Sequence, residues 1–314
     1  NVADLRTKGW EASITWGDSF TLASKPFNYR IMAGIGDNTS KVTKYDNPNR
    51  TLTDPYEGQQ LGEIWGYVVD GYFKTDEEAR NYKVDQSFVN QMINASALDN
   101  GLHAGDLKFV DLDGNNKIEQ TTSANDRKDM KVIGNSLPRY NYNFGISADW
   151  YGIDFSVLFQ GIGKQNWYPG AETSMFWGPY SRPYASFIPS DFMSQVWSEE
   201  NTNAYFPRPR GYVALGSNRE LAVVNTKYLQ NLAYCRLKNL SIGYTLPDKW
   251  LSKIGFEKIR VYFSSENLLT FTKLHSDYID PEQASASNSW KTSKSDANIY
   301  PWAKTYSFGV DITF

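Results

Sequence analysis

The residues best suited to chemistry lie in one short acidic turn. Asp111, Asp113 and Asn115 alternate along the chain, and Gly114 permits a bend between them. Calcium is bound by oxygen ligands at such alternate positions, followed by a backbone carbonyl and a further carboxylate. The spacing therefore predicts a calcium-binding turn over residues 111–126. Its predicted ligands are Asp111, Asp113, Asn115, Lys117 through its carbonyl, Glu119 and Asp126.

The twelfth position of this turn departs from the usual calcium pattern. Thr122 stands where an EF-hand-type loop carries a bidentate carboxylate, and Asp126 comes four residues later. Residues 121–125 would have to bulge outward for Asp126 to reach the ion. An Asp/Asn/Gly turn stabilised by its own side-chain hydrogen bonds would explain the same residues. Both interpretations stay open.

A second group of candidates is aromatic. Rings with polar tips crowd one stretch that also contains Gly and Pro, and such rings can stack on sugars. They can equally fill the core of a large loop or meet a protein partner. The residues predicted to contact substrate or partner are Trp167, Tyr168, Trp177, Tyr180 and Tyr184.

Other chemistry has little support in the sequence. No nucleophile elbow, glycine-rich phosphate loop or histidine-based triad occurs. Asp280 and Glu282 are close enough in sequence to suggest paired acids, but a solvated loop is the simpler interpretation. A net charge of −3 offers no continuous basic surface for nucleic acid. We therefore predict neither an enzyme nor a nucleic-acid-binding protein.

Alternation with a period of two predicts the elements that hold these groups. A strand between hydrocarbon and a wet lumen must be apolar at every second position. The last nine residues fit this pattern, and their ring-bearing and aliphatic members form the predicted terminal strand of a barrel. These are Tyr306, Phe308, Val310, Ile312 and Phe314.

Six further segments alternate in the same way, at about 10–16, 29–35, 140–150, 153–160, 240–246 and 259–264. On two of them the polar positions predict lumen-facing side chains, namely Asn141, Asn143, Asp149, Asp154 and Gln160. About seven strands leave two open edges, which would expose unpaired backbone groups to lipid. We therefore expect further strands beyond these seven.

The segments between the strands are unequal in length. Short turns alternate with long irregular stretches at about 46–137, 163–226 and 270–301. This asymmetry is typical of outer-membrane barrels, whose long loops are extracellular. Within the first stretch, Thr75 and Glu78 predict a capped helix that runs to about Asn90. Two alternatives stay open: a secreted calcium-dependent carbohydrate-binding β-protein and a barrel-embedded hydrolase.

Several motifs resemble the SusC/RagA family of TonB-linked outer-membrane transporters. They are GDLKFVDLDGNNKIE from Gly105, IGNSLPRYNYNFG from Ile133, YCRLKNLSIGYTLP from Tyr234, RVYFSSENLLTF from Arg260 and the YSFGVDITF terminus. The opening residues Asn1, Gly9, Trp10 and Glu11 also resemble the barrel of this family, so the resemblance covers essentially the whole chain.

The resemblance implies an all-β fold, the C-terminal portion of a large antiparallel transmembrane β-barrel of the TonB-dependent transporter type, with long extracellular loops. The plug and early strands would lie outside residues 1–314. The implied function is active import of a bulky nutrient, an oligosaccharide or a peptide, across the cell outer membrane of Bacteroidetes-type bacteria. The implied partners are the lipid bilayer, TonB through a segment outside this chain, and a SusD-like surface lipoprotein on the loops.

Overall fold

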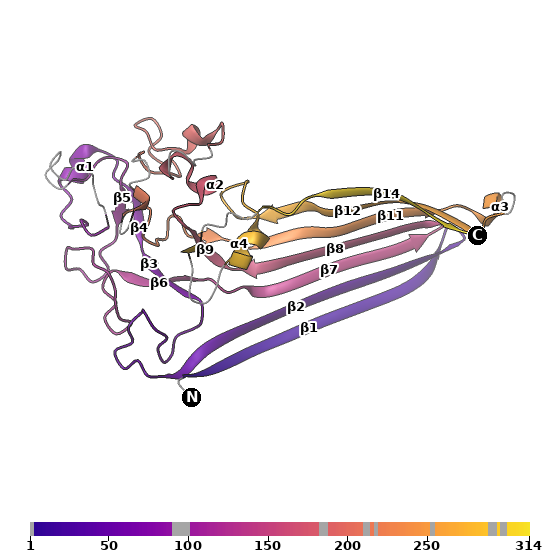
Figure 1. Ribbon diagram of the computed structural model, residues 1–314, viewed down its shortest axis with the longest axis horizontal. Helices are drawn as coiled ribbons and strands as arrows, with labels where there is room; N and C mark the ends of the chain where they lie inside the picture. The colour runs from indigo at the N-terminus through magenta and orange to yellow at the C-terminus, as the bar shows by residue number, and fades with distance from the viewer. Residues whose placement is uncertain are drawn as a thin grey trace.

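The computed structural model describes residues 3–89, 101–181, 188–209, 214–216, 219–251, 255–287, 294–295 and 300–314. Its main feature is an elongated sheet of seven antiparallel strands (Figure 1). In spatial order they are β1 (Ala3–Leu22), β2 (Lys25–Tyr45), β7 (Arg139–Trp150), β8 (Ile153–Lys164), β11 (Tyr234–Thr245), β12 (Lys258–Thr272) and β14 (Thr305–Thr313). All seven strands predicted from alternation are present.

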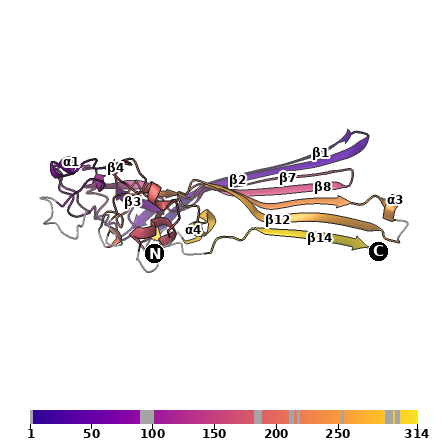
Figure 2. The same cartoon turned by 90° about the horizontal axis from the view of Figure 1, so that it is seen from above.

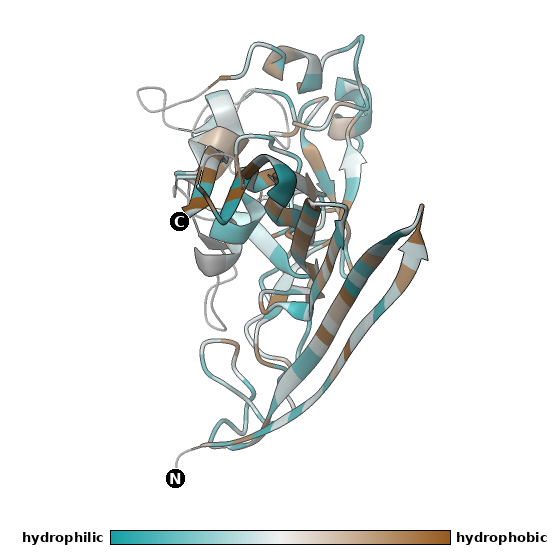
Figure 3. Ribbon diagram, turned by 90° about the vertical axis from the view of Figure 1, so that its right-hand side faces the viewer, coloured by the Kyte–Doolittle hydropathy of each residue, from teal (hydrophilic) through white to brown (hydrophobic). Residues whose placement is uncertain are grey.

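The register separates the sheet into an apolar and a polar face. Directly opposed residues share a face, and Val261 lies opposite Val310 as Phe263 lies opposite Phe308. The hydropathy colours alternate along the strands in Figure 3. Large side chains of the apolar face are exposed across the whole sheet, among them Trp10, Ile14, Trp16, Ile153, Ile242 and Phe271. A water-soluble protein does not leave such a continuous apolar face open.

The strands are longer than a bilayer requires. The 20 residues of β1 extend over roughly 65 Å, whereas a hydrocarbon core is about 30 Å thick. Strands β1 and β2 therefore continue beyond any membrane. Among the described residues, β1 pairs only with β2 and β14 only with β12, so both edges of the sheet are open. Figure 2 shows these two strands at opposite sides of the sheet.

Short and long connections lie at opposite ends of the strands (Figure 1). Ala23 and Ser24 turn β1 into β2 with positive φ angles, and Tyr151 and Gly152 turn β7 into β8 in the same way. The helix α3 (Asp248–Leu251) lies in the short connection from β11 to β12. The three long segments gather at the other end, as their lengths predicted.

The described residues of these three segments, which run over 46–138, 165–233 and 273–304, form what we call the loop body. Small sheets order it, pairing β3 (Glu63–Tyr67) with β6 (Met130–Asn135), β4 (Val69–Tyr72) with β5 (Leu107–Phe109), and β9 (Asn166–Pro169) with β10 (Gln230–Asn231) and β13 (Lys294–Ser295). Its short helices are α1 (Asp76–Arg80), α2 (Ser174–Trp177), η1 (Gly178–Tyr180), η2 (Phe192–Gln195) and α4 (Pro281–Ser287). One buried core joins all three segments, from Phe109 through Phe206 to Ile279.

Helix α1 is shorter than the sequence predicted. The Thr75 hydroxyl accepts a hydrogen bond from the Glu78 backbone N–H at 3.1 Å, so the predicted cap is present. The helix nevertheless ends at Arg80, where the chain turns toward Asp85 to meet the acidic segment. No helix of the described residues is long and apolar enough to cross a membrane.

Candidate functional site

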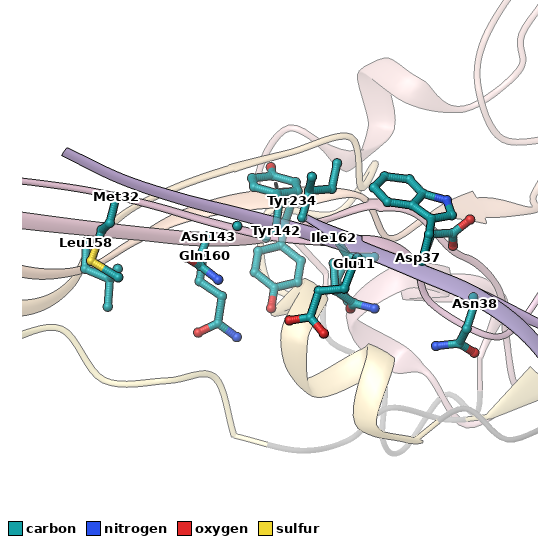
Figure 4. A pocket seen from close by; sticks show the side chains of 17 residues that line it. Glu11, Met32, Asp37, Asn38, Tyr142, Asn143, Leu158, Gln160, Ile162 and Tyr234 are labelled. Atoms are coloured by element: carbon teal, nitrogen blue, oxygen red, sulfur yellow. Dashed lines mark hydrogen bonds between the residues drawn. The ribbon is translucent and has the colours of Figure 1, made fainter. Parts of the chain in front are cut away.

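The polar face of the sheet carries a hollow of about 930 Å³ near the loop body. Figure 4 shows Glu11, Asn143 and Gln160 reaching to the same side of the sheet. The register accounts for this arrangement, because Asn143 lies opposite both Gly34 and Gln160. The polar part of the lining therefore consists of four carboxamides and two carboxylates, and one of these carboxylates, Asp37, is paired with Arg139. Such a surface can hydrogen-bond a polar ligand without holding it by strong charge.

The predicted polar residues fall into two places on this face. Asn141, Asn143 and Gln160 line the hollow just described. Asp149 and Asp154 lie opposite each other farther from the loop body and line a smaller hollow of about 330 Å³. All five share the polar face, as their alternation predicted.

Asp154 is compensated by a cation that the sequence prediction missed. Arg260 donates to Asp154 at 2.8 and 2.6 Å and to Asp311 at 3.2 Å. Gly243 lies opposite Asp154, and Arg260 lies diagonally across from it, opposite Thr245; a Cβ at Gly243 would stand 2.5 Å from both side chains. The ion pair therefore crosses β11 directly over a residue that has no side chain. Arg260 occupies a polar position in the alternation of its strand, so the sequence alone could have placed it on the same face as Asp154.

A buried ion network joins the polar face to the loop body. Arg236 on β11 donates to Asp280 at 2.7 Å and to Glu282 at 2.7 Å, and its Nε donates to Thr270 at 2.9 Å. Lys238 donates to Glu282 at 2.8 Å. The side chains of Arg236 and Asp280 are only 2% and 5% exposed. The interpretation of Asp280 and Glu282 as a solvated loop is therefore wrong, because a buried guanidinium needs both carboxylates.

The acidic turn brings together a different carboxylate from the one predicted. Oxygen atoms of Asp111, Asp113 and Asp129 lie within 4.8 Å of one another. Asp129 is buried and accepts from the backbone N–H groups of Leu112 and Glu119 at 2.8 and 2.7 Å. Asp126 is exposed and outside this group. Residues 121–125 fold back instead of bulging, so Asp126 stays away from Asp111 and Asp113, and Asp129 lies beside them instead.

The other predicted ligands form hydrogen bonds and ion pairs within the turn. Asn115 donates to Asp113 and to Glu119, each at 3.2 Å, and the Lys117 backbone N–H donates to Asn115 at 2.8 Å. Glu119 also pairs with Lys128 at 3.3 Å, which lowers the pKa of its carboxyl group. These contacts fit the self-stabilised turn that the sequence left open.

The electrostatics of the turn favour a cation. Burial raises the pKa of Asp129, and the nearby charges of Asp113 and Asp111 act in the same direction. Three carboxylates this close repel one another, and the two backbone donors of Asp129 offset only part of that repulsion. A divalent cation among their oxygens would relieve it.

The aromatic candidates are not placed to contact a ligand. Trp167, Tyr168, Trp177 and Tyr180 are each 0% exposed and belong to the core of the loop body. Tyr168 donates its hydroxyl to the carbonyl of Leu221 at 2.8 Å. The prediction of substrate contact is therefore wrong for these four, and the alternative of a loop core describes them. Tyr184 lies outside the described residues.

The terminal strand agrees with its prediction. Tyr306, Phe308, Val310 and Ile312 share one face of β14 and are 48–84% exposed, while Phe314 follows the strand and is 82% exposed. Opposite-face residues such as Ser307 and Asp311 pair with Ser264 and Arg260 of β12. The apolar side chains therefore have neither a second sheet nor a helix against them among the described residues.

Comparison with known proteins supports the fold and shows which proteins the chain is similar to. The whole chain aligns with 29% of the length of a TonB-dependent receptor of Formosa agariphila, at 26% sequence identity. It also aligns with 27% of the length of the TonB-dependent receptor SusC of Bacteroides thetaiotaomicron, at 22% identity. Among solved structures, the RagAB peptide importer in its open-open state superposes with a TM-score of 0.65 at 19% identity, over all of this chain and 29% of that one. No family model matches the chain.

These similarities indicate the class of protein, and within it the family. The described sheet is part of a large antiparallel barrel of the TonB-dependent transporter type. Within that class the chain matches the SusC/RagA family, as the motifs indicated. The chain spans about three tenths of the length of the relatives that it matches.

Proposed function

We propose that this chain forms part of an outer-membrane importer that takes up a bulky nutrient, an oligosaccharide, with energy supplied through TonB. The observation that carries the proposal is the two-faced sheet with open edges. Its exposed apolar face suits hydrocarbon, and its polar face suits a water-filled passage. Open edges are tolerated in lipid only where further strands close the barrel.

The lining of the polar face supports a polar and bulky cargo. Carboxamides supply much of the polar lining of the hollow near the loop body; Asp37 there is paired with Arg139, and Asp154 beyond it is paired with Arg260. Such a wall can exchange hydrogen bonds with a moving ligand and offers no strong charge to trap it. A sugar chain carries many hydroxyl groups and suits this wall.

The loop body is the proposed extracellular part and the docking surface for a SusD-like lipoprotein. Its segments pack into one core, so they present a defined surface. Co-purification of a surface lipoprotein with the native protein would support the pairing. Recovery of the native protein without such a partner under mild detergent extraction would argue against it.

We also propose that the acidic turn of the loop body binds Ca²⁺. The carboxylates of Asp111, Asp113 and Asp129 would hold the ion, with Asn115 as a further oxygen ligand after a change of partner. Bound Ca²⁺ would offset the repulsion that raises the pKa of Asp129 and would tie residues 111–119 to 129. Its role there would be structural.

Membrane fractionation and uptake test the proposal together. We expect to find the native protein in the outer-membrane fraction, and we expect it to stay folded only in detergent or lipid. We also expect oligosaccharide uptake to stop when TonB is removed. A protein that is monomeric and folded in plain buffer would instead be a secreted carbohydrate-binding protein. Glycan turnover by the purified protein would favour the hydrolase.

A further inference from the structure

A third cavity, of about 770 Å³, lies where the last loop segment meets the strands. Its strand side is formed by Arg236, Thr270 and Thr272, which the register places on the polar face. Its other side is formed by the loop body, through Ser174, Met175, residues 276–281, residues 300–302 and Lys304. The cavity therefore opens on the proposed passage, at the end where the long loops are.

The cavity has the open aromatic rings that the core of the loop body does not provide. Tyr278, Trp302 and Tyr300 line it and are 47%, 50% and 91% exposed. Large exposed rings beside polar groups are suited to the apolar faces of sugars. Tyr278 and Tyr300 belong to the last long segment, at about 270–301, in which the sequence analysis predicted no site, and Trp302 directly follows it.

The ring of Trp302 is held in place by the ion network. Its backbone N–H donates to Asp280 at 3.2 Å, and the Lys238 ammonium lies 5.4 Å from the ring centroid. Asp280 is itself held by Arg236. A ring fixed before a ligand arrives loses little entropy on binding, which favours a binding role for it.

One polar atom in the cavity lacks a partner. The Oδ1 atom of Asn267 is buried and accepts no hydrogen bond from the described residues, although its amide donates to Ala303 at 3.2 Å. A buried acceptor without a donor costs about 1–3 kcal/mol. A ligand hydroxyl in the cavity would supply the missing donor.

The charges of the cavity indicate a neutral ligand. Arg236 donates to Asp280, Glu282 and Thr270, so its charge is balanced by carboxylates. The remaining lining charges, Asp277 and Lys304, have opposite signs. The cavity therefore has no free excess of either charge.

We propose that this cavity, lined by Tyr278, Trp302, Tyr300 and Asn267, is a binding subsite for a neutral oligosaccharide on its way into the passage. This inference rests on the proposed function and names the substrate class of that import route. The rings would stack on sugar faces, and Asn267 would accept from a sugar hydroxyl. The subsite adjoins the carboxamide hollow, so a sugar chain could reach from one to the other.

Titration of the native protein in detergent tests the subsite. The probes are neutral hexasaccharides of glucose, mannose, galactose or fructose, together with a pool of mixed decapeptides. We expect at least one hexasaccharide to bind, and Trp302→Ala to weaken its binding roughly tenfold. Tyr300→Ala should also weaken binding, and its ring is too exposed to be needed for folding. Trp250→Ala, at the opposite end of the strands and 60% exposed, is the matched control.

Several results would overturn the subsite. They are binding of none of the hexasaccharides, equal affinity in the Trp302→Ala and Tyr300→Ala variants, or loss of decapeptide binding alone in these variants. Uptake distinguishes the subsite from the proposed function. TonB-dependent uptake with unchanged saccharide affinity in both variants would remove only the subsite, whereas absence of the native protein from the outer membrane would remove the function itself.

Discussion

Gln160 on β8 and Arg236 on β11 lie directly opposite each other on the polar face of the sheet. Gln160 lines the carboxamide hollow, and Arg236 lines the aromatic cavity beside the loop body. The two cavities are therefore neighbours on one continuous surface. Arg236 also binds the carboxylates of Asp280 and Glu282 in the loop body. Gln160 and Arg236 therefore lie where the strands meet the loops.

Removal of Asp280 should loosen this fastening. Asp280→Ala would leave the buried Arg236 with one carboxylate fewer, and breaking a buried ion pair in this way costs about 3–5 kcal/mol. We expect a lower unfolding temperature and faster hydrogen exchange in residues 273–287. Asp277→Ala changes an exposed neighbouring acid and is the control. Equal exchange rates in the two variants would contradict the role of the network.

The sequence predicted the strands well because alternation is a local signal. Each of the seven strands carries its own apolar face, and lipid enforces that pattern residue by residue. The ion network was missed because Arg236 and Asp280 are 44 residues apart in the chain. The burial of Trp177 was missed for a similar reason. The sequence of a long loop does not show whether an aromatic ring packs into a core or contacts a ligand.

Gly243 should be required for the ion pair that crosses it. In Gly243→Ala the new Cβ would push Arg260 away from Asp154, and we expect a loss of about 1–3 kcal/mol in the free energy of unfolding. The same substitution in an Arg260→Ala background should cost less, because Arg260 is gone and Asp154, no longer held by it, is free to turn away from the new Cβ. Urea unfolding of the four proteins in lipid vesicles measures this. An equal cost in both backgrounds would show that Gly243 matters for another reason.

Calcium should stabilise the loop body through Asp129. Chelation should lower the unfolding temperature of the native protein, and Asp129→Asn should abolish the difference between calcium and chelator. Asp126→Asn is the matched control and should keep the difference, because Asp126 is outside the carboxylate group. No effect of chelator on the native protein would leave the acidic turn as a self-stabilised turn.

The calcium effect should also depend on pH in a defined direction. The pKa of Asp129 is raised, so in the absence of metal the carboxyl group keeps its proton to a higher pH than in the unfolded chain. Calcium must displace that proton, so its affinity should fall as the pH drops toward and below the raised pKa. Titrations of terbium luminescence as a calcium substitute, at several pH values, measure this. An affinity that rises on acidification would contradict the assignment of Asp129 as a ligand.

The face that meets lipid can be tested on a single strand. Phe308 is 84% exposed on the apolar face of β14, and Ser307 beside it lies on the polar face. A lysine at the lipid face near mid-membrane costs about 2–4 kcal/mol, whereas the same residue facing water costs little. Phe308→Lys should therefore lower the folded yield in vesicles, measured by heat-dependent gel migration, while Ser307→Lys should not. If Ser307→Lys were the more damaging change, the two faces would be assigned the wrong way round and the passage would lie on the other side of the sheet.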